Sequence, residues 1–223
     1  MDNGGIFLNL WRDIPVGDDP PEKLNAVVEV ISGSRDKYEY NREWEAFVLD
    51  RVLHSSVVFP VEYGFIPQTW FHDKDPLDIM ILSYEPLEVG CIVKTKPIGA
   101  LILEDEKGED PKILSIPISD PRFNGYHNLS DVHPHRLKEI QEFFETYKRL
   151  EPNKWVRFKT WKNAEEAKKI VQSSAEMFVP VKFNVSRLVR FWRGVRLVMF
   201  VLDKSNHSRL VRFWRGVRSV IFV

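Results

Sequence analysis

The sequence predicts a mainly β fold, either a barrel or a sandwich, with helices packed outside it. Six short runs rich in β-branched and aromatic residues are separated by glycine, proline and serine, as in all-β domains. Helical periodicity begins only after them, near residue 134. A chain of 223 residues is long enough for one such domain with its own core and for an additional tail. The predicted strands cover 26–32, 37–41, 46–53, 78–84, 91–103 and 112–118.

The two helices are predicted by apolar spacing and by their first residues. From Pro134 to Leu150, apolar side chains recur at steps of three and four residues, and proline is favoured at a first helical position. A seventh strand is expected over 155–161. Asn163 and Glu166 then have the spacing of a capping box, which predicts the start of a second helix ending near Phe178.

The composition is that of a globular protein, with 43% hydrophobic and 29% charged residues. A single cysteine, Cys91, allows no internal disulfide and suits a reducing cytoplasm, where we expect the protein to be located. The first residues lack the basic and apolar regions of a signal peptide. No apolar stretch reaches the length of about 18 residues that a membrane span requires.

The net charge of zero conceals two parts of opposite charge. Residues 179–223 hold ten lysines and arginines and one acidic residue, which leaves 22 basic and 31 acidic residues in 1–178. Such asymmetry indicates that an acidic domain, 1–178, and a basic tail, 179–223, are separate units.

The tail contains a tandem repeat with a period of 22 residues. The segment 186–201 recurs at 208–223 with two differences in sixteen positions. Two copies are too few for a stable repeat architecture, so we expect a poorly ordered tail whose partner is unknown. Two functional interpretations stay open. Its regularly spaced arginines and its aromatic residues could contact anionic lipid, or they could bind nucleic acid.

Three aspartates, Asp73, Asp75 and Asp78, lie within six residues just before an apolar strand. Each negative charge raises the free energy of ionising the next, so a counter-charge is expected. Asp73 and Asp75 would point the same way in an extended segment. Oxygen ligands of this kind suit Mg²⁺. A calcium EF-hand loop is excluded, because its sixth position would be Asp78 instead of glycine and its twelfth Tyr84 instead of glutamate.

Other charged residues extend this pattern. A second acidic cluster covers 104–110, on a turn at Lys107 and Gly108, and we expect Glu104, Glu106 and Glu109 to be solvated there. Glu29 and Glu39 are placed on strands. Cations that could hold phosphate oxygens are Lys37, Arg51 and Lys148. Carboxylates for metals and cations for phosphate together indicate Mg²⁺-dependent phosphate chemistry.

Several motifs, in order, resemble the first family of soluble inorganic pyrophosphatases, over about residues 10–178. They read VVEVISGSRDKYEYN, LDRVL, FPVEYGFIPQT, DKDPLDIMIL, GCIVKTKPIGAL, EDEKGEDPKIL, FFETYKRLE and KWVRFKTW. The resemblance implies an OB-like, five-stranded closed β-barrel with flanking helices. It also implies Mg²⁺-dependent hydrolysis of pyrophosphate to two phosphates, and a homo-oligomer, a hexamer in bacterial and archaeal members.

The resemblance also implies roles for individual residues. Asp75 would be the catalytic base that takes a proton from the attacking water. The metal ligands would be Asp73, Asp78, Asp105, Asp110 and Glu39, with Glu29 at a further metal or its water shell. The phosphates would be held by Lys37, Arg51, Tyr63, Tyr147, Lys148 and also Lys112.

Three positions depart from the family pattern: Lys74 between the first two aspartates, and Phe59 and Glu62 before Tyr63. A cation at 74 would weaken metal binding unless its side chain turns to solvent. A different class of function also stays open, namely a non-catalytic OB-like module with a tail that contacts nucleic acid or membrane. The aspartates at positions 73, 75, 78, 105 and 110 argue against this alternative, because a nucleic-acid-binding face is basic. The domain itself requires no nucleic-acid or membrane partner. For a Mg²⁺-dependent hydrolase of a different phosphate substrate, the sequence shows no signature of a base or sugar pocket.

Overall fold

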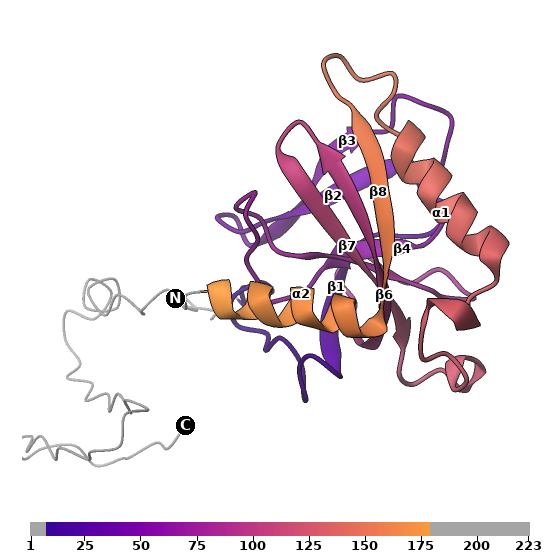
Figure 1. Ribbon diagram of the computed structural model, residues 1–223. Coiled ribbons are helices and arrows are strands. Elements are labelled where there is room, and N and C mark those ends of the chain that lie inside the picture. The colour runs from indigo at the N-terminus through magenta and orange to yellow at the C-terminus, as the bar shows by residue number, and fades with distance from the viewer. Residues whose placement is uncertain (1–7, 179–223) are drawn as a thin grey trace, which may run out of the picture. The chain divides into compact units, whose positions relative to one another are not determined.

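The computed structural model of the protein describes residues 8–178, which contain eight strands and two α-helices (Figure 1). The basic tail with its tandem repeat lies outside the described residues. The helices are α1 (Pro134–Thr146) and α2 (Ala164–Met177), and two short 3₁₀ turns cover Pro121–Phe123 and Leu129–Asp131. The strands are β1 (Leu24–Val30), β2 (Asp36–Asn41), β3 (Ala46–Val52), β4 (Glu62–Phe65), β5 (Asp78–Ile81), β6 (Ile92–Asp105), β7 (Gly108–Pro117) and β8 (Val156–Asn163).

Five strands close into a ring. The pairing order is β1-β4-β5-β7-β6, and β6 pairs back with β1 from Leu24↔Thr95 to Val27↔Ile92. The β5–β7 pair is parallel, and the other pairs of the ring are antiparallel. β8 extends the sheet beside β6, while β2 and β3 form a separate hairpin. The predicted OB-like, five-stranded closed barrel is therefore confirmed.

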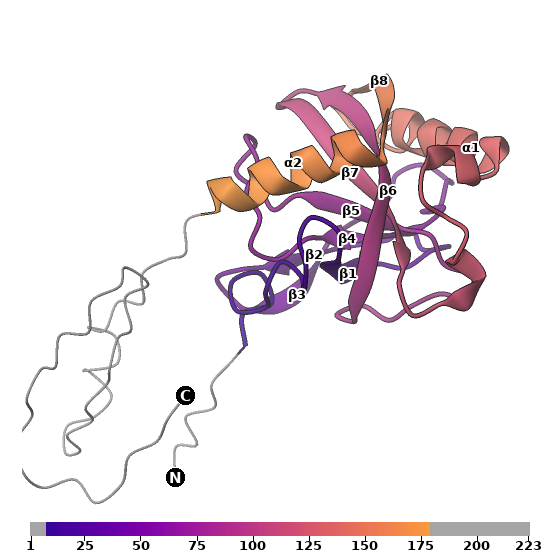
Figure 2. The ribbon, with the colours of Figure 1, turned by 60° about the horizontal axis from the view of Figure 1, so that its bottom comes forward.

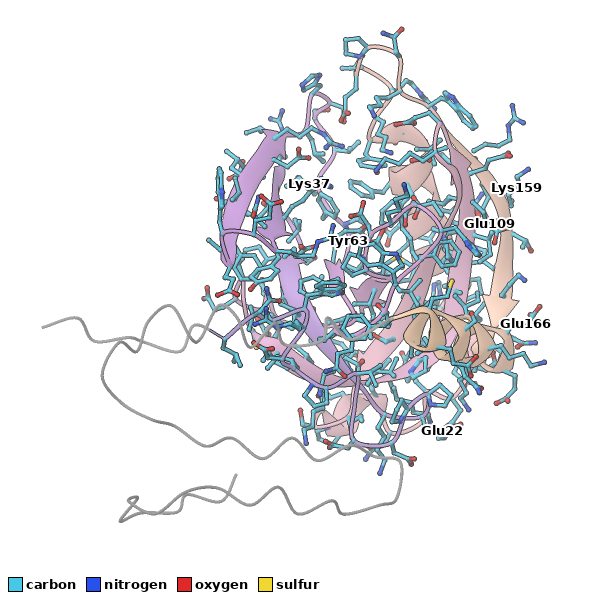
Figure 3. The ribbon with its side chains drawn as sticks, turned by 90° about the vertical axis from the view of Figure 1, so that its left-hand side faces the viewer. Glu22, Lys37, Tyr63, Glu109, Lys159 and Glu166 are labelled. Atoms are coloured by element: carbon cyan, nitrogen blue, oxygen red, sulfur yellow. The ribbon has the colours of Figure 1, made fainter. Side chains whose placement is uncertain are left out.

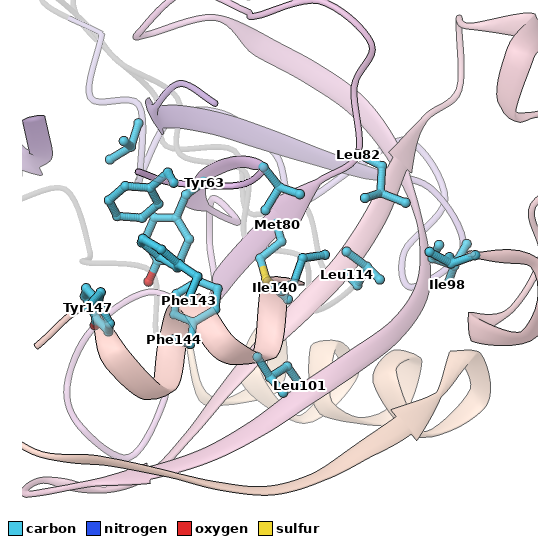
Figure 4. Close-up of a cluster of buried hydrophobic side chains, with 14 of the residues drawn as sticks. Tyr63, Met80, Leu82, Ile98, Leu101, Leu114, Ile140, Phe143, Phe144 and Tyr147 are labelled. Carbon is cyan, nitrogen blue, oxygen red and sulfur yellow. The ribbon is translucent and has the colours of Figure 1, made fainter. Parts of the chain in front are cut away.

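β1, β4, most of β5 and the inner parts of β6 and β7 are buried on both faces, which suits the long apolar runs in these strands. Alternate residues enter two different clusters, because side chains alternate along a strand. Met80 and Leu114 join a cluster that includes Ile140 and Phe144 of α1 (Figure 4). Ile79, next to Met80, enters the cluster under α2 instead.

The two helices cover different parts of the sheet. α2 packs along β6 and β8, and α1 packs against β8 (Figures 1 and 2). Asn163 and Glu166 form the predicted capping box of α2, and Pro134 occupies the first turn of α1. No helix within residues 8–178 is long and apolar enough to cross a membrane.

Several boundaries differ from the sequence prediction, among them the start of β7, which lies at Gly108 instead of residue 112, and one strand was not predicted. α1 ends at Thr146 and not at Leu150, whose side chain is 63% exposed and anchors no further turn. β5 ends at Ile81, before residue 84. β4 was missed, because it is only four residues long and contains Gly64. A Cβ at position 64 would lie 1.8 Å from the carbonyl oxygen of Val27, so glycine permits the close approach of β1 there.

Candidate functional site

A cleft of about 740 Å³ opens beside the barrel and gathers side chains from distant parts of the chain. It is lined by all thirteen residues that the sequence singled out for metal, base or phosphate roles, which are Glu29, Lys37, Glu39, Arg51, Tyr63, Asp73, Asp75, Asp78, Asp105, Asp110, Lys112, Tyr147 and Lys148. Their placement together makes this cleft the candidate active site.

Several separate elements of the fold supply the side chains that line the cleft. The β2–β3 hairpin carries Lys37 on one side, and the β6–β7 hairpin carries Glu109 opposite it, with Tyr63 of β4 between them (Figure 3). The turn before β5 supplies the first aspartates, and the end of α1 supplies Lys148. The fold thus brings side chains that lie more than 100 positions apart in the sequence into one cleft.

The first two aspartates lie on a turn, so the extended geometry expected for them is wrong. Lys74, between them, has φ +68°, in the left-handed region, and the Asp75 amide donates to Asp73 Oδ1 at 3.2 Å. This local hydrogen bond is the kind that lets aspartate stabilise a turn. The Lys74 side chain is exposed and is not among the residues lining the cleft. The departure at position 74 therefore adds no cation to the site.

Lys112 lies at the centre of the buried end of the cleft, with only 2% of the residue exposed. Its Nζ lies 2.6 Å from Asp78 Oδ2, 2.9 Å from Asp110 Oδ1 and 3.1 Å from the Tyr63 hydroxyl oxygen. The Tyr63 hydroxyl donates in turn to Asp78. Burial lowers the pKa of Lys112, but the two carboxylates outweigh it and raise that pKa well above its usual value. Lys112 is therefore a permanent cation.

Two further ion pairs fix the cations at the other walls. Lys148 Nζ lies 2.9 Å from Asp105 Oδ2, and Arg51 Nε lies 2.8 Å from Glu151 Oε1. Burial raises the pKa of Asp105, but hydrogen bonds from Lys148 and from the Lys107 amide leave that pKa below its usual value. Both acids are buried, so each cation is held by a carboxylate that is itself fixed.

Two acids of the cleft have a raised pKa, because their surroundings disfavour the charged carboxylate. Burial raises the pKa of Glu29 to about 8, although its carboxylate accepts a 2.7 Å hydrogen bond from the Tyr40 amide. Burial also raises the pKa of Asp73, and the negative charges of Asp75 and Asp78 add to it. Within residues 8–178, no lysine or arginine forms an ion pair with Asp73.

The charges lining the cleft do not balance. Eleven acidic and seven basic side chains leave a formal excess of four negative charges. The acids offer only hard oxygen donors, which is the chemistry that Mg²⁺ prefers. Among the described residues, no three His, Cys, Asp or Glu side chains converge closely enough to chelate an ion, since Lys112 and Lys148 lie between the acids. The donor type and the uncompensated charge at Asp73 nevertheless fit divalent cations.

Sequence reasoning missed several lining residues. Trp11, Arg42 and Trp70 line one end of the cleft, and Arg42 donates to Asp75 Oδ1 at 3.1 Å. Lys107 lies 3.6 Å from the other oxygen of Asp75. Glu106 and Glu109 are exposed, as expected, and they also line the cleft. No local motif marks these residues, because they come together only through the fold.

The departures at Phe59 and Glu62 lie outside the cleft lining. Phe59 is fully buried and packs on Tyr63 and Phe143, with ring centroids 5.5 and 4.7 Å apart. Glu62 is also buried, and it accepts hydrogen bonds from the Ser83 hydroxyl at 2.9 Å and the Ser32 amide at 3.1 Å. Both substitutions are accommodated by the core behind the cleft.

Comparisons with known proteins agree on one family. The family model described as inorganic pyrophosphatase matches residues 26–179. An inorganic pyrophosphatase of Haloferax volcanii is 39% identical over 172 residues, which cover 77% of this chain and 97% of that protein. One of Nostoc is 44% identical over 158 residues, covering 71% and 93%. The crystal structure of inorganic pyrophosphatase from Thermus thermophilus superposes with a TM-score of 0.75 at 41% identity, covering 77% of this chain and 99% of that one.

Proposed function

Because the chain belongs to the inorganic pyrophosphatase family and its activity is the hydrolysis of pyrophosphate, we propose that magnesium ions and the thirteen predicted residues of the cleft carry out this reaction. When bound, the divalent cations neutralise substrate charge and activate the attacking water. The residues that would hold them are Asp73, Asp78, Asp105, Asp110 and Glu39, with Glu29 nearby.

The formal charge of the cleft is the observation that supports the metal requirement. Pyrophosphate is a polyanion, and eleven acids against seven bases would repel it from this cleft. Divalent cations held by these acids would offset that excess. At Asp73, whose pKa is raised by burial and by the neighbouring carboxylates, such a cation would also relieve the like-charge repulsion. Substrate and metal binding are therefore expected to depend on each other.

The basic side chains of the walls bind and orient the two phosphate groups. Arg51 presents a planar fork suited to phosphate oxygens, and Lys37 and Lys148 act as point charges. Burial raises the pKa of Tyr63 well above its usual value, so the phenol keeps its proton; this proton is donated to Asp78 in the structure and would turn to a phosphate oxygen when substrate binds. These groups stabilise the charge that develops on the departing phosphate when the bridging P–O bond breaks.

Asp75 is the proposed general base. Its carboxylate is half-exposed at the open end of the cleft, where water can reach it. It accepts the proton of the water whose oxygen attacks phosphorus, and so the water adds to one phosphate while the other leaves. Asp78 and Asp110 are paired with the buried Lys112 and are less exposed than Asp75, whose ion pairs with Arg42 and Lys107 leave its carboxylate open to water.

We propose that pyrophosphate is the substrate and that the domain needs no nucleic-acid or membrane partner. We propose a cytoplasmic location, because the single cysteine, Cys91, is exposed and suits a reducing compartment. We also propose a homo-oligomer, a hexamer, which rests on the family resemblance alone. Light scattering coupled to size-exclusion chromatography tests this assembly, and a monomer at micromolar concentration would contradict it.

The substitution Asp75→Asn tests the proposed base. A positioned general base contributes about 10²–10⁴-fold to a rate, so we expect D75N to lose most of its turnover while it still folds and binds metal. Asp18→Asn is the matched control, because Asp18 is also ion-paired, to Lys94 at 2.6 Å, with a similarly exposed side chain. D18N should turn over like the wild type.

Three readouts keep the outcomes distinct. Phosphate release gives turnover, circular dichroism gives folding, and calorimetry with Mg²⁺ gives metal binding. Turnover of D75N at the wild-type rate would remove Asp75 as the base.

A further inference from the structure

Arg42 is the one cation of the cleft that contacts the proposed base and is also held by aromatic rings. Its Cζ lies 5.0 Å from the ring centroid of Trp11 and 4.9 Å from that of Trp70. The two indole rings are 5.3 Å apart and tilted by 42°. Arginine stacks on aromatic faces and still presents its N–H groups in a rigid fork. The guanidinium plane is thereby fixed relative to both rings.

The aromatic pair is itself anchored to the turn that carries Asp75. Trp11 Nε1 donates to the Thr69 carbonyl at 3.0 Å, and the Gln68 amide donates to the Trp11 carbonyl at 2.8 Å. On the other side, the side-chain amide of buried Asn9 donates to the carbonyl of Arg42 at 3.1 Å. The segment before β1, the β2–β3 hairpin and the turn before β5 thus meet at Arg42.

From this arrangement we propose that Arg42 is a positioning residue for Asp75. Arg42 Nη2 lies 3.1 Å from Asp75 Oδ1, and it directs the carboxylate whose other oxygen faces Lys107 at 3.6 Å. Lys107 is 58% exposed and on a hairpin tip, so it cannot fix the carboxylate in the same way. The inference rests on the proposed role of Asp75. Misplacing a reacting group by about 1 Å can reduce a rate about 10²-fold.

Three variants test the proposal. Arg42→Met removes the guanidinium at similar length, and Arg42→Lys keeps the charge but loses the planar fork. Arg122→Met is the matched control, because Arg122 also lies over a ring, 4.4 Å from the Tyr84 centroid, and pairs with Asp120 at 2.7 Å, away from the cleft. We expect R42M to lower kcat about ten- to hundredfold with KM within about twofold, R42K to recover part of kcat, and R122M to change neither.

A double-mutant cycle then asks whether Arg42 acts through Asp75. Once the carboxylate is replaced, Arg42 has nothing to position, so R42M/D75N should turn over within about twofold of D75N alone. Unchanged kcat in R42M, a rise in KM at constant kcat, or full additivity in the cycle would each overturn the proposal. Thermal melting checks folding, and R42K is compared in the same way if R42M does not fold. Wild-type turnover in D75N would instead remove the premise, whatever R42M does.

Discussion

Replacing Lys112 by methionine in the metal-free protein tests whether this buried cation stabilises the fold by compensating the negative charges of Asp78 and Asp110. The ammonium group has two carboxylate partners, Asp78 and Asp110, within 2.9 Å and is almost fully buried. Methionine has a similar length and no charge, so the two carboxylates would face each other without a counter-ion. Breaking a buried ion pair by removing one partner destabilises a protein by about 3–5 kcal/mol. In a domain of this size we expect a loss of about 6–20 °C in Tm.

Urea unfolding, followed by far-UV circular dichroism, measures the loss of unfolding free energy, first in EDTA and then in millimolar Mg²⁺. In EDTA the midpoint of K112M should fall well below that of the wild type. In Mg²⁺ the difference should shrink, because a bound cation supplies the missing positive charge and stabilises the folded state by mass action. The control is Lys159→Met, which breaks a pair between exposed side chains, Lys159 and Glu104, 2.7 Å apart; its midpoint should match the wild type.

Two results would refute this reasoning. If K112M unfolds in EDTA at the urea concentration of the wild type, the carboxylates do not depend on Lys112. If Mg²⁺ widens the difference between the two proteins, the cation does not bind where Lys112 leaves negative charge uncompensated.

Two other predictions concern Glu29 and the tail. Glu29→Gln should stabilise the metal-free protein increasingly with pH, because the folded pKa of about 8 exceeds the usual 4.5. The folded state therefore keeps a proton that the unfolded chain releases, so wild-type stability falls between about pH 4.5 and 8, by at most about 5 kcal/mol. Urea unfolding of both proteins at pH 5 and pH 9 measures this, and an equal difference at both values would disprove it. Truncation after Phe178 should leave kcat and KM unchanged, because the described cleft residues lie between Trp11 and Lys154; a large loss of phosphate release would give the tail a role in the reaction.

The barrel could be predicted because its strands obey a local rule. The runs 98–103 and 111–116 are buried on both faces and form the inner parts of β6 and β7, and turn residues mark the ends of these strands. β4 escaped prediction because only four residues pair, and because its buried Glu62 resembles a surface residue in sequence. The buried carboxylate of Glu62 is stabilised by hydrogen bonds from Ser83 and Ser32, which lie 21 and 30 residues away in the sequence.

The aspartates of 73–78 could be predicted from the residues alone, because like charges gathered in a short segment require an explanation, whereas Tyr63, Tyr147 and Lys112 were indicated only by the resemblance to the family. Trp11, Arg42 and Trp70 carry no such signal, since a tryptophan or arginine in isolation has many ordinary roles. Only the fold brings these three segments together around Asp75.

The measurement that tests the account most directly is phosphate release from pyrophosphate by the purified full-length chain, with Mg²⁺ and with EDTA. We expect release that requires the divalent cation, because the cleft lining carries a formal excess of four negative charges. Equal release in EDTA, or no release by folded protein in Mg²⁺, would contradict it.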